Sequence, residues 1–416
     1  MVAASLASIF AAFRHRNFRL FIIGQFTSLC GTWMQVVAQG WLVLQLTNSA
    51  FAVGLVTALG SLPILLFTLY GGVVADRVNK RRFILILQSL MLAEALTLAL
   101  LTATHLVTVH WVMGLAIFSG LLSAFEVPTR QSFLAEIVER QDLMNAIALN
   151  SSAFNLARVI GPALAAGLIA SVGLAACFFA NAASYLAVIT SLVRMDPGVA
   201  PEPRSESVAS ALREGFAFVF GNRWPRALVI LIATFSVFGY PFLPLMPVFA
   251  RDELRIGASG YAALVASIGV GAALAAFFLA GFGHRVRRSS LVLASSTLFG
   301  LVLLAASQAP QFWSALALFT LAGCLMALNG IAANTMLQSE APDELRGRVM
   351  GFYSFIVLGL APFGSFQAGW IAEHLGVRTA FAMGAVMCLL VALGLTWRMS
   401  SQVRERRAAA RSARTC

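Results

Sequence analysis

Twelve long apolar segments divide this chain, and they constrain its fold more than any other feature. A helix needs about 20 residues to cross the roughly 30 Å of hydrocarbon in a bilayer, and the segments are close to or above that length. A helix also satisfies its own backbone hydrogen bonds inside lipid, where water cannot do so. The sequence therefore predicts an all-α membrane protein with twelve transmembrane helices. The expected spans are 18–46, 51–75, 83–105, 110–130, 144–171, 174–194, 227–250, 259–283, 290–308, 312–337, 348–373 and 379–398.

The composition fits a chain whose solvent is lipid. Of its 416 residues, 59% are hydrophobic and only 11% are charged, whereas about a quarter of the residues are charged in soluble proteins. The net charge of +12 would suggest a nucleic-acid partner in a soluble protein. Here, however, the arginines lie in short loops between apolar segments. We therefore expect the anionic headgroups of a lipid bilayer, and no nucleic acid, as the partner of this charge.

Positive charge is sorted along the chain, because nearly all of the 29 Lys and Arg residues fall in every second gap between apolar segments. The alternate gaps hold only Arg251, Arg255 and Arg378, and Arg158 lies inside an apolar segment. Loops rich in Lys and Arg remain on the cytoplasmic side of a membrane. The pattern predicts that both termini are cytoplasmic. The basic gaps are 14–19, 77–82, 130–140, 194–226, 285–288, 346–348 and 398–414.

The longest polar stretch lies near the middle of the chain and divides it in two. It contains prolines and a glycine near 196–203, followed by apolar residues at helical spacing from Val208 to Phe220. This predicts a linker with an amphipathic helix on the cytoplasmic face; a disordered tether is the alternative. The expected parts are an N-terminal six-helix bundle (1–193), this linker (194–226), a C-terminal six-helix bundle (227–398) and a basic cytoplasmic tail (399–416).

Two similar stretches indicate an internal repeat. After the fourth expected span, an acidic loop at 135–142 leads to Pro162, and after the tenth span a similar loop at 338–345 leads to Pro362. Repeats of six spans have the same orientation in the membrane, so an axis along the membrane normal relates them. We therefore expect two pseudo-symmetric six-helix bundles.

The loop after the second span resembles the signature of the major facilitator superfamily, G-x-x-x-D-R/K-x-G-R/K-R/K. The matching residues are Gly72, Asp76, Arg77, Lys80 and Arg81. Asn79 replaces the second glycine, and Asn tolerates the left-handed backbone of a tight turn better than most residues. The resemblance implies the twelve-helix fold of this superfamily and a conformational latch between its two halves, with Asp76 as the central charge. The alternative is that these are ordinary cytoplasmic loop charges.

A second resemblance lies in the fifth span. Gly161, Pro162 and Gly167 resemble the Gly-Pro motif of antiporters in the superfamily, where small residues allow close helix contacts and proline bends the helix. Together with the stretch from Glu126 through Pro128, the chain looks most like the drug:proton antiporter branch that includes the enterobactin exporter and macrolide efflux proteins. This implies a location in the bacterial cytoplasmic (inner) membrane.

Ionisable residues are rare inside membrane spans and usually functional there, and the candidates in this chain are Glu94, Glu126 and Arg158. Glu94 lies about 18 Å along its helix from Arg82, and Glu126 lies about 24 Å along its own from His110. Burial in a medium of low dielectric favours the protonated form of a carboxylate. We expect Glu126 to be the proton-coupling acid, Arg158 its electrostatic partner, and Glu94 the second choice. A fixed ion pair or a helix-end hydrogen bond is the alternative role for Glu126.

A polar stripe on the first span predicts a central cavity. Its residues follow one another at intervals of three and four, which places them on one face of a helix. Such a face must contact protein or water rather than lipid. Helix–helix hydrogen bonding without substrate contact is the alternative. The expected cavity residues are Gln25, Ser28, Thr32, Gln35 and Gln39 of this stripe, with Trp33, Tyr240, Asn329, Asn334, Phe235 and Phe238.

These features and the resemblance together predict a secondary active exporter of small amphiphilic molecules, drug-like or siderophore-like, that works by alternating access and proton antiport. A facilitator, a solute importer or a lysophospholipid transporter on the same fold is the alternative. We do not expect an enzyme, since the chain has no G-x-x-x-x-G-K-[ST], H-E-x-x-H or G-x-S-x-G sequence. The expected partners are a small-molecule substrate, protons and lipid, for a monomer without a cofactor. The five cysteines lack metal-type spacing, so no metal is expected.

Overall fold

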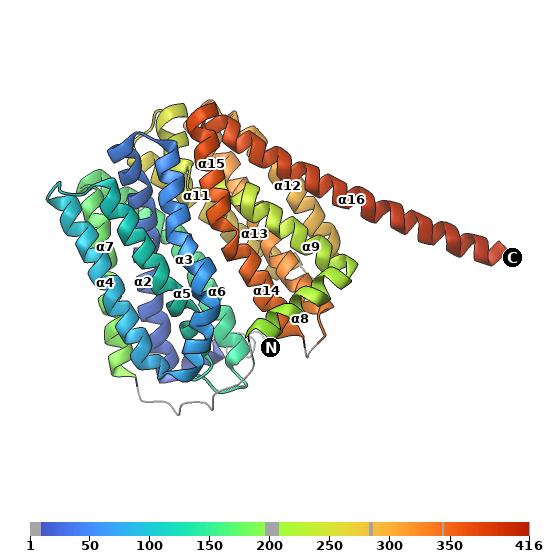
Figure 1. Ribbon diagram of the computed structural model, residues 1–416, viewed down its shortest axis with the longest axis horizontal. Helices are drawn as coiled ribbons and strands as arrows, with labels where there is room; N and C mark the ends of the chain where they lie inside the picture. The colour runs from blue at the N-terminus through green and yellow to red at the C-terminus, as the bar shows by residue number, and fades with distance from the viewer. Residues whose placement is uncertain (1–9, 196–207, 283–285, 343–344, 416) are drawn as a thin grey trace.

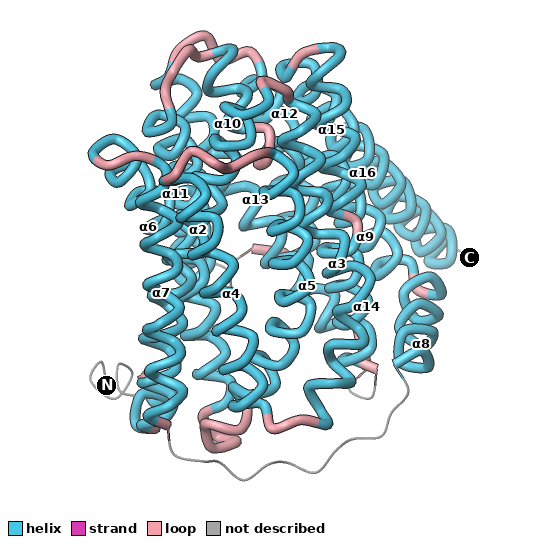
Figure 2. Tube along the Cα trace, turned by 60° about the vertical axis from the view of Figure 1, so that its left-hand side comes forward, coloured by secondary structure: helices cyan, strands magenta, loops and turns pink. Residues whose placement is uncertain are grey.

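The protein is a bundle of long helices, seen in a computed structural model that describes residues 10–195, 208–282, 286–342 and 345–415. Among these residues, twelve helical spans are long and apolar enough to cross a membrane. Figure 2 shows the loops gathered at the two ends of the bundle. We call the end with the loop at Val78 and Asn79 the basic end, and the end with Asn48 and Gly376 the opposite end.

The N-terminal half begins with the short helix η1 (Ala11–Arg14) and continues with six long helices that pack mainly on one another. Three of these helices are preceded by a polar capping residue. The side chains of Ser49, Asn79 and Thr108 each accept a hydrogen bond from a free backbone N–H in the first turn of the helix that follows. The six helices are α2 (Arg16–Thr47), α3 (Ala50–Arg77), α4 (Lys80–Ala103), α5 (Val109–Leu134), α6 (Leu143–Ser171) and α7 (Leu174–Arg194).

A separate helix, α8 (Val208–Gly221), precedes the C-terminal half and lies in the segment for which the sequence predicts an amphipathic helix. It packs on α14 through the rings of Phe216 and Phe220, which contact Phe352, and through an ion pair between Glu214 and Arg348. The proline-rich stretch that precedes α8 lies outside the described residues. The C-terminal half comprises α9 (Arg223–Thr234), η2 (Phe235–Gly239), η3 (Tyr240–Phe242), α10 (Met246–Val248), η4 (Phe249–Glu253), α11 (Ala258–Phe282), α12 (Arg288–Ser307), α13 (Phe312–Glu340), α14 (Arg346–Gly359), α15 (Ala361–Leu375) and α16 (Val377–Thr415).

The seventh span is not a regular helix. After α9, it passes through a π-helical turn, a 3-10 turn, a single α-turn and a second π-helical turn before it ends at Glu253. Pro241, Pro244 and Pro247 lie in this part. Each proline lacks a backbone N–H and its ring collides with the carbonyl of the previous turn, so the hydrogen bonds shift to other spacings.

The eleventh span, Arg348–Leu375, is a single span as the sequence predicts for 348–373, but its helix is interrupted at Leu360. Helix α14 ends at Gly359, and α15 begins at Ala361 with Pro362 in its first turn, where proline is well tolerated. Pro162, its counterpart in the first half, lies inside the continuous helix α6. The two prolines that mark the repeat in the sequence therefore have different structural effects.

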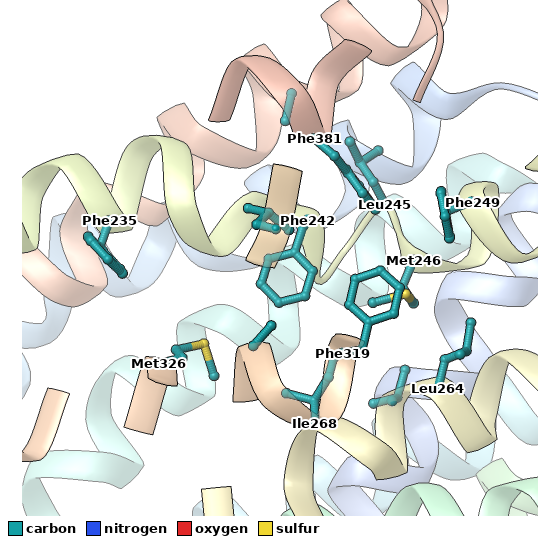
Figure 3. Close-up of a cluster of buried hydrophobic side chains, with 14 of the residues drawn as sticks. Phe235, Phe242, Leu245, Met246, Phe249, Leu264, Ile268, Phe319, Met326 and Phe381 are labelled. Atoms are coloured by element: carbon teal, nitrogen blue, oxygen red, sulfur yellow. The ribbon is translucent and has the colours of Figure 1, made fainter. Parts of the chain in front are cut away.

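Aromatic side chains fill the core of the C-terminal half (Figure 3). The rings of Phe242 and Phe319 stack with centroids 5.8 Å apart, and those of Phe249 and Phe381 stack at 5.2 Å. Offset and edge-to-face contacts of this kind add to the stabilisation that burial gives. The rings come from η3, η4, α13 and α16, so they join the irregular seventh span to its neighbours.

The two halves lie side by side in Figure 1 and meet along two pairs of helices, α3 with α15 and α6 with α11. Glycines allow the close approach in both pairs. A Cβ atom on Gly54 of α3 would lie 2.8 Å from the Cα of Gly369 of α15. A Cβ atom on Gly269 of α11 would lie 2.8 Å from the carbonyl oxygen of Arg158 of α6.

Candidate functional site

A cavity of about 410 Å³ lies between the two halves, and α2, α3 and α5 form most of its wall. Its remaining wall comes from α7, from the irregular seventh span and from α11. The lining is mainly apolar, with a few amides and hydroxyls. The polar and aromatic lining residues are Thr32, Trp33, Gln35, Gln39, Thr57, Ser119, Ser123, Asn181, Tyr185 and Tyr261.

The polar stripe of the first span divides between this cavity and a helix–helix contact. Thr32, Gln35 and Gln39 lie in the lining, as does Trp33. Gln25 and Ser28 are buried on α2 and do not belong to the lining. The stripe faces the cavity only along its second half, because α7 covers its first half. Gly24, for example, faces Ser191 of α7, and Gly31 faces Ser184 and Asn181.

The cavity residues expected from the second half of the chain lie elsewhere. Asn329 is buried and donates a hydrogen bond to the Ser296 hydroxyl, which joins α13 to α12. Phe235 is fully buried, with its ring 5.0 Å from that of Phe299. Neither belongs to the cavity lining, and Tyr240, Asn334 and Phe238 are also outside it. The second half contributes Leu243, Pro244, Tyr261 and Val265.

A buried carboxylate lies directly behind the cavity wall. Glu94 on α4 is only 3% exposed, and both of its oxygens accept a hydrogen bond from the Gln35 side-chain amide, at 3.2 and 3.3 Å. The Gln35 carbonyl oxygen in turn accepts from Asn181 of α7 at 2.7 Å, and Ser184 donates to Asn181. Among the described residues, Glu94 has no cationic partner. Since Gln35 also lines the cavity, one hydrogen bond connects this acid to the cavity wall.

Glu126 has a different environment, which corrects the expected pairing with Arg158. It accepts a hydrogen bond at 2.8 Å from Arg130, which lies four residues further along the same helix, and another at 3.3 Å from Gln88. Residues four apart meet on one face of a helix. Arg158 does not pair with Glu126. Its guanidinium instead lies over the ring of Trp33, 5.5 Å from the ring centroid.

The Gly-Pro motif of the fifth span brings α6 against α2. A Cβ atom on Gly161 would lie 2.5 Å from the Trp33 Cβ and 2.8 Å from the Cys30 carbonyl oxygen. Only glycine allows this approach. Gly167, by contrast, has open space around it. Helix α6 continues through Pro162 without interruption, so the structural role of the motif rests on Gly161.

The two halves are joined by hydrogen bonds at the opposite end of the bundle. The Glu373 carboxylate on α15 accepts from the Ser49 hydroxyl at 3.0 Å and from the Phe51 backbone N–H at 3.1 Å. Arg251 donates to the Asn48 side-chain oxygen at 2.8 Å. These hydrogen bonds join the two halves at the opposite end of the bundle.

The signature loop lies at the basic end and is attached to its own half. Lys80 forms a buried ion pair with Glu136 at 2.6 Å. Arg81 donates to the carbonyl oxygens of Leu192 and Val193, the free acceptors in the last turn of α7. Asp76 and Arg77 are exposed and form no ion pair with any described residue, and Gly72 has open space around it.

Asn79 corrects one expectation about this loop. Its backbone is extended, with φ −68° and ψ 104°, rather than left-handed. Its side-chain oxygen accepts a hydrogen bond from the Arg82 backbone N–H at 3.0 Å and so caps α4. Asn is one of the preferred residues at this position of a helix, which explains why it serves here in place of glycine.

Several site residues were missed by the sequence reasoning. Asn181, Ser184 and Tyr185 form a polar face on α7, and Ser119 and Ser123 lie one turn apart on α5. Their spacing of three and four was a detectable signal, of the same kind as the stripe on the first span.

The whole chain matches a protein family described as transmembrane secretion effector, over residues 7–415. It is similar to the multidrug efflux pump Tap of Mycolicibacterium fortuitum, with 28% identity over 386 residues that cover 89% of this chain and 93% of that protein. It is also similar to the staphyloferrin A transporter of Staphylococcus aureus, with 23% identity over 90% of this chain and 94% of that protein. Against the enterobactin exporter EntS of Shigella flexneri, the identity is 26% over 82% and 81% of the two chains.

Solved structures share the fold at low sequence identity. A bacterial homologue of the human lysosomal transporter Spinster, in an inward-facing and occupied conformation, has a TM-score of 0.72 and 14% identity, over 92% of this chain and 96% of that one. The POT family transporter PepTSo has a TM-score of 0.76 and 14% identity, over 93% and 98%. The fold, the twelve spans and the family match agree. The chain therefore belongs to the transmembrane secretion effector family of the major facilitator superfamily, as a multi-pass small-molecule efflux transporter of the bacterial inner membrane and not an enzyme.

Proposed function

We propose that the protein exports small amphiphilic molecules, drug-like or siderophore-like, by alternating access and in exchange for protons. The observation that carries this proposal is the cavity between the halves, which the Glu373 and Arg251 hydrogen bonds join at one end. Its apolar wall with a few amides and hydroxyls suits a substrate that is mostly apolar and needs a small number of polar contacts. Three relatives, named as a multidrug efflux pump, a staphyloferrin A transporter and an enterobactin exporter, support the substrate class.

Glu94 is the acid that we propose to couple proton movement to transport, ahead of Glu126. Burying a carboxylate costs several kcal/mol unless a cation and hydrogen bonds compensate it. Glu126 has such compensation from Arg130, whereas Glu94 has only neutral hydrogen-bond donors among the described residues. Protonation therefore removes a larger free-energy cost of burying negative charge at Glu94 than at Glu126. Gln35 donates a hydrogen bond to Glu94 and also lines the cavity, so a change in the protonation of Glu94 directly affects a residue of the cavity wall.

We further propose that the basic end faces the cytoplasm, together with both termini, and that the protein works as a monomer. The distribution of Lys and Arg supports this orientation. With the halves joined at the opposite end, the described conformation is then inward-facing. The cavity lies within a single chain, so a second copy is not needed to complete it.

The exposed state of Asp76 leads to a prediction about the proposed latch. Since Asp76 has no ion-pair partner among the described residues, Asp76→Asn should leave the inward-facing conformation intact. It should weaken only the outward-facing state, in which the latch would form. We expect the population to shift toward the inward-facing state by about 10- to 150-fold, which corresponds to one charged hydrogen bond. Distances between spin labels at Leu106 and Trp313, both exposed at the opposite end, would report this shift. An unchanged distribution would remove Asp76 from the latch.

The proposed function is tested with purified protein in liposomes that carry an imposed pH gradient. The probes are an anionic dye, 8-anilinonaphthalene-1-sulfonate, its neutral analogue N-phenyl-1-naphthylamine, the cation rhodamine 6G, and a fluorescent lysophospholipid. Antiport predicts dye accumulation only in vesicles with an acidic interior. Accumulation only with an alkaline interior would indicate an importer, and equilibration that ignores the gradient would indicate a facilitator. Movement of the lysophospholipid alone would indicate a lipid transporter.

A further inference from the structure

Arg158 is a cation near the middle of a membrane span, without a counter-charge among the described residues. It is the sixteenth of the 29 residues of α6, and its side chain is partly exposed. Among the described residues, its side chain makes no hydrogen bond and no ion pair. A charge at the centre of a bilayer is costly, and arginines in such positions normally face a protein interior and pair with another group. The structure therefore leaves the guanidinium available to a partner that is not part of the protein.

The surroundings of Arg158 connect it to the cavity. The guanidinium lies 5.5 Å from the centroid of the Trp33 ring, and Trp33 belongs to the cavity lining. Contact with an aromatic face stabilises a guanidinium and also fixes its orientation. The Tyr240 hydroxyl, from the seventh span, lies close enough to the guanidinium to interact with it electrostatically. A phenol can donate a hydrogen bond, so Arg158 and Tyr240 offer donors from both halves of the protein.

Arg158 also lies at a contact between the two halves. Its backbone carbonyl is one of the atoms that α11 approaches at Gly269, at the contact of α6 with α11. A group bound between Arg158 and Tyr240 would therefore touch both halves close to the point about which they pack. Such a ligand can shift the equilibrium between two conformations, because its contacts change when the halves move.

We propose that Arg158 binds an anionic group of the exported substrate, so that the preferred substrates are amphiphiles that carry a carboxylate, sulfonate or phosphate. This inference rests on the proposed export function and specifies its substrate class. The apolar body of the substrate occupies the cavity next to Trp33, and the anionic group reaches the guanidinium. Arginine suits this role because its planar fork can form two parallel hydrogen bonds with an oxyanion.

The test compares two dyes that differ mainly in charge, using the full chain in detergent. The anionic dye is 8-anilinonaphthalene-1-sulfonate, and the neutral one is N-phenyl-1-naphthylamine. We expect Arg158→Met to weaken binding of the anionic dye by at least about tenfold, the usual effect of losing a hydrogen-bonded charge. Binding of the neutral dye should change less than about twofold, which also shows that the variant is folded. Arg158→Lys should restore part of the affinity, since it keeps the charge and loses the fork.

The outcomes separate this inference from the proposed function. If the wild-type protein transports the neutral dye and does not bind the anionic one, the inference is wrong and the export function stands. The same conclusion follows if Arg158→Met binds both dyes like the wild type, or loses both equally and so shows a structural role. If the wild-type protein moves none of the dyes under any gradient, the export function itself fails, and this inference fails with it.

Discussion

Glu94→Gln is expected to abolish proton-driven accumulation of substrate while substrate binding is retained. The substituted amide keeps the shape of the side chain and can still accept a hydrogen bond from Gln35, so the contact between α4 and α2 should survive. It cannot take up or release a proton. A gradient of one pH unit supplies about 1.4 kcal/mol per proton, which supports about tenfold accumulation of substrate. We expect the variant to reach no accumulation at all, with dye inside and outside at equal concentration.

The matched control for this experiment is Glu126→Gln. It removes the second buried acid, but it also replaces the anionic partner of Arg130, 2.8 Å away, with a neutral amide. We expect this variant to be less stable and to retain its coupling to the pH gradient. Accumulation is measured in liposomes with an acidic interior, and dye binding is measured separately in detergent. The assignment reverses if Glu94→Gln accumulates dye normally and Glu126→Gln does not.

Gly54→Val is expected to force the opposite end of the bundle open. A Cβ atom at this position would lie 2.6 Å from the Ser365 carbonyl oxygen and 2.8 Å from the Cα of Gly369. Both are backbone atoms, so α3 and α15 must separate to make room. Overpacking typically costs about 1–3 kcal/mol, which corresponds to a roughly 5- to 150-fold shift of an equilibrium. The cost falls only on the conformation in which these helices touch.

Spin labels at Leu106 and Trp313 would measure the change, because the two positions are exposed at the opposite end and belong to different halves. We expect a longer distance between the labels and a loss of most net transport. Gly114→Val is the control. Gly114 lies at a similar depth, near the start of α5, and has no neighbour within 4 Å of an added Cβ. Equal behaviour of the two variants would show that the contact of α3 with α15 does not hold the closed state.

The sequence was sufficient for the architecture of this protein. Hydropathy places helices reliably in a membrane because lipid cannot satisfy a backbone hydrogen bond, so each long apolar segment must become a helix. The interruption of the helix at Leu360 could not be predicted from the sequence in the same way. Pro162 and Pro362 occupy similar positions in the two halves, yet only Pro362 begins a new helix. The packing around each proline decides this, and a single sequence does not record it.

The site could be predicted only in part, for a related physical reason. The polar stripe on α2 could be predicted because the spacing of its residues within one helix determines which of them share a face. Which helix covers that face is a property of the packing. Asn181 on α7 covers one part of it, and Glu94 on α4 meets Gln35 there. The partner of Glu126 was readable in principle, since Arg130 lies one helical turn away, but it was interpreted only as a loop charge.

The aromatic core of the second half has a consequence for how this transporter can acquire new substrates. The stacked rings around Phe242 and Phe249 leave little freedom for substitution, whereas most of the cavity wall comes from α2, α3 and α5. If the cavity binds substrate as proposed, selectivity and rigidity belong to different parts of the chain. Under selection with an unfamiliar toxin, resistance alleles should accumulate in the first half of the gene, while the second half stays nearly invariant.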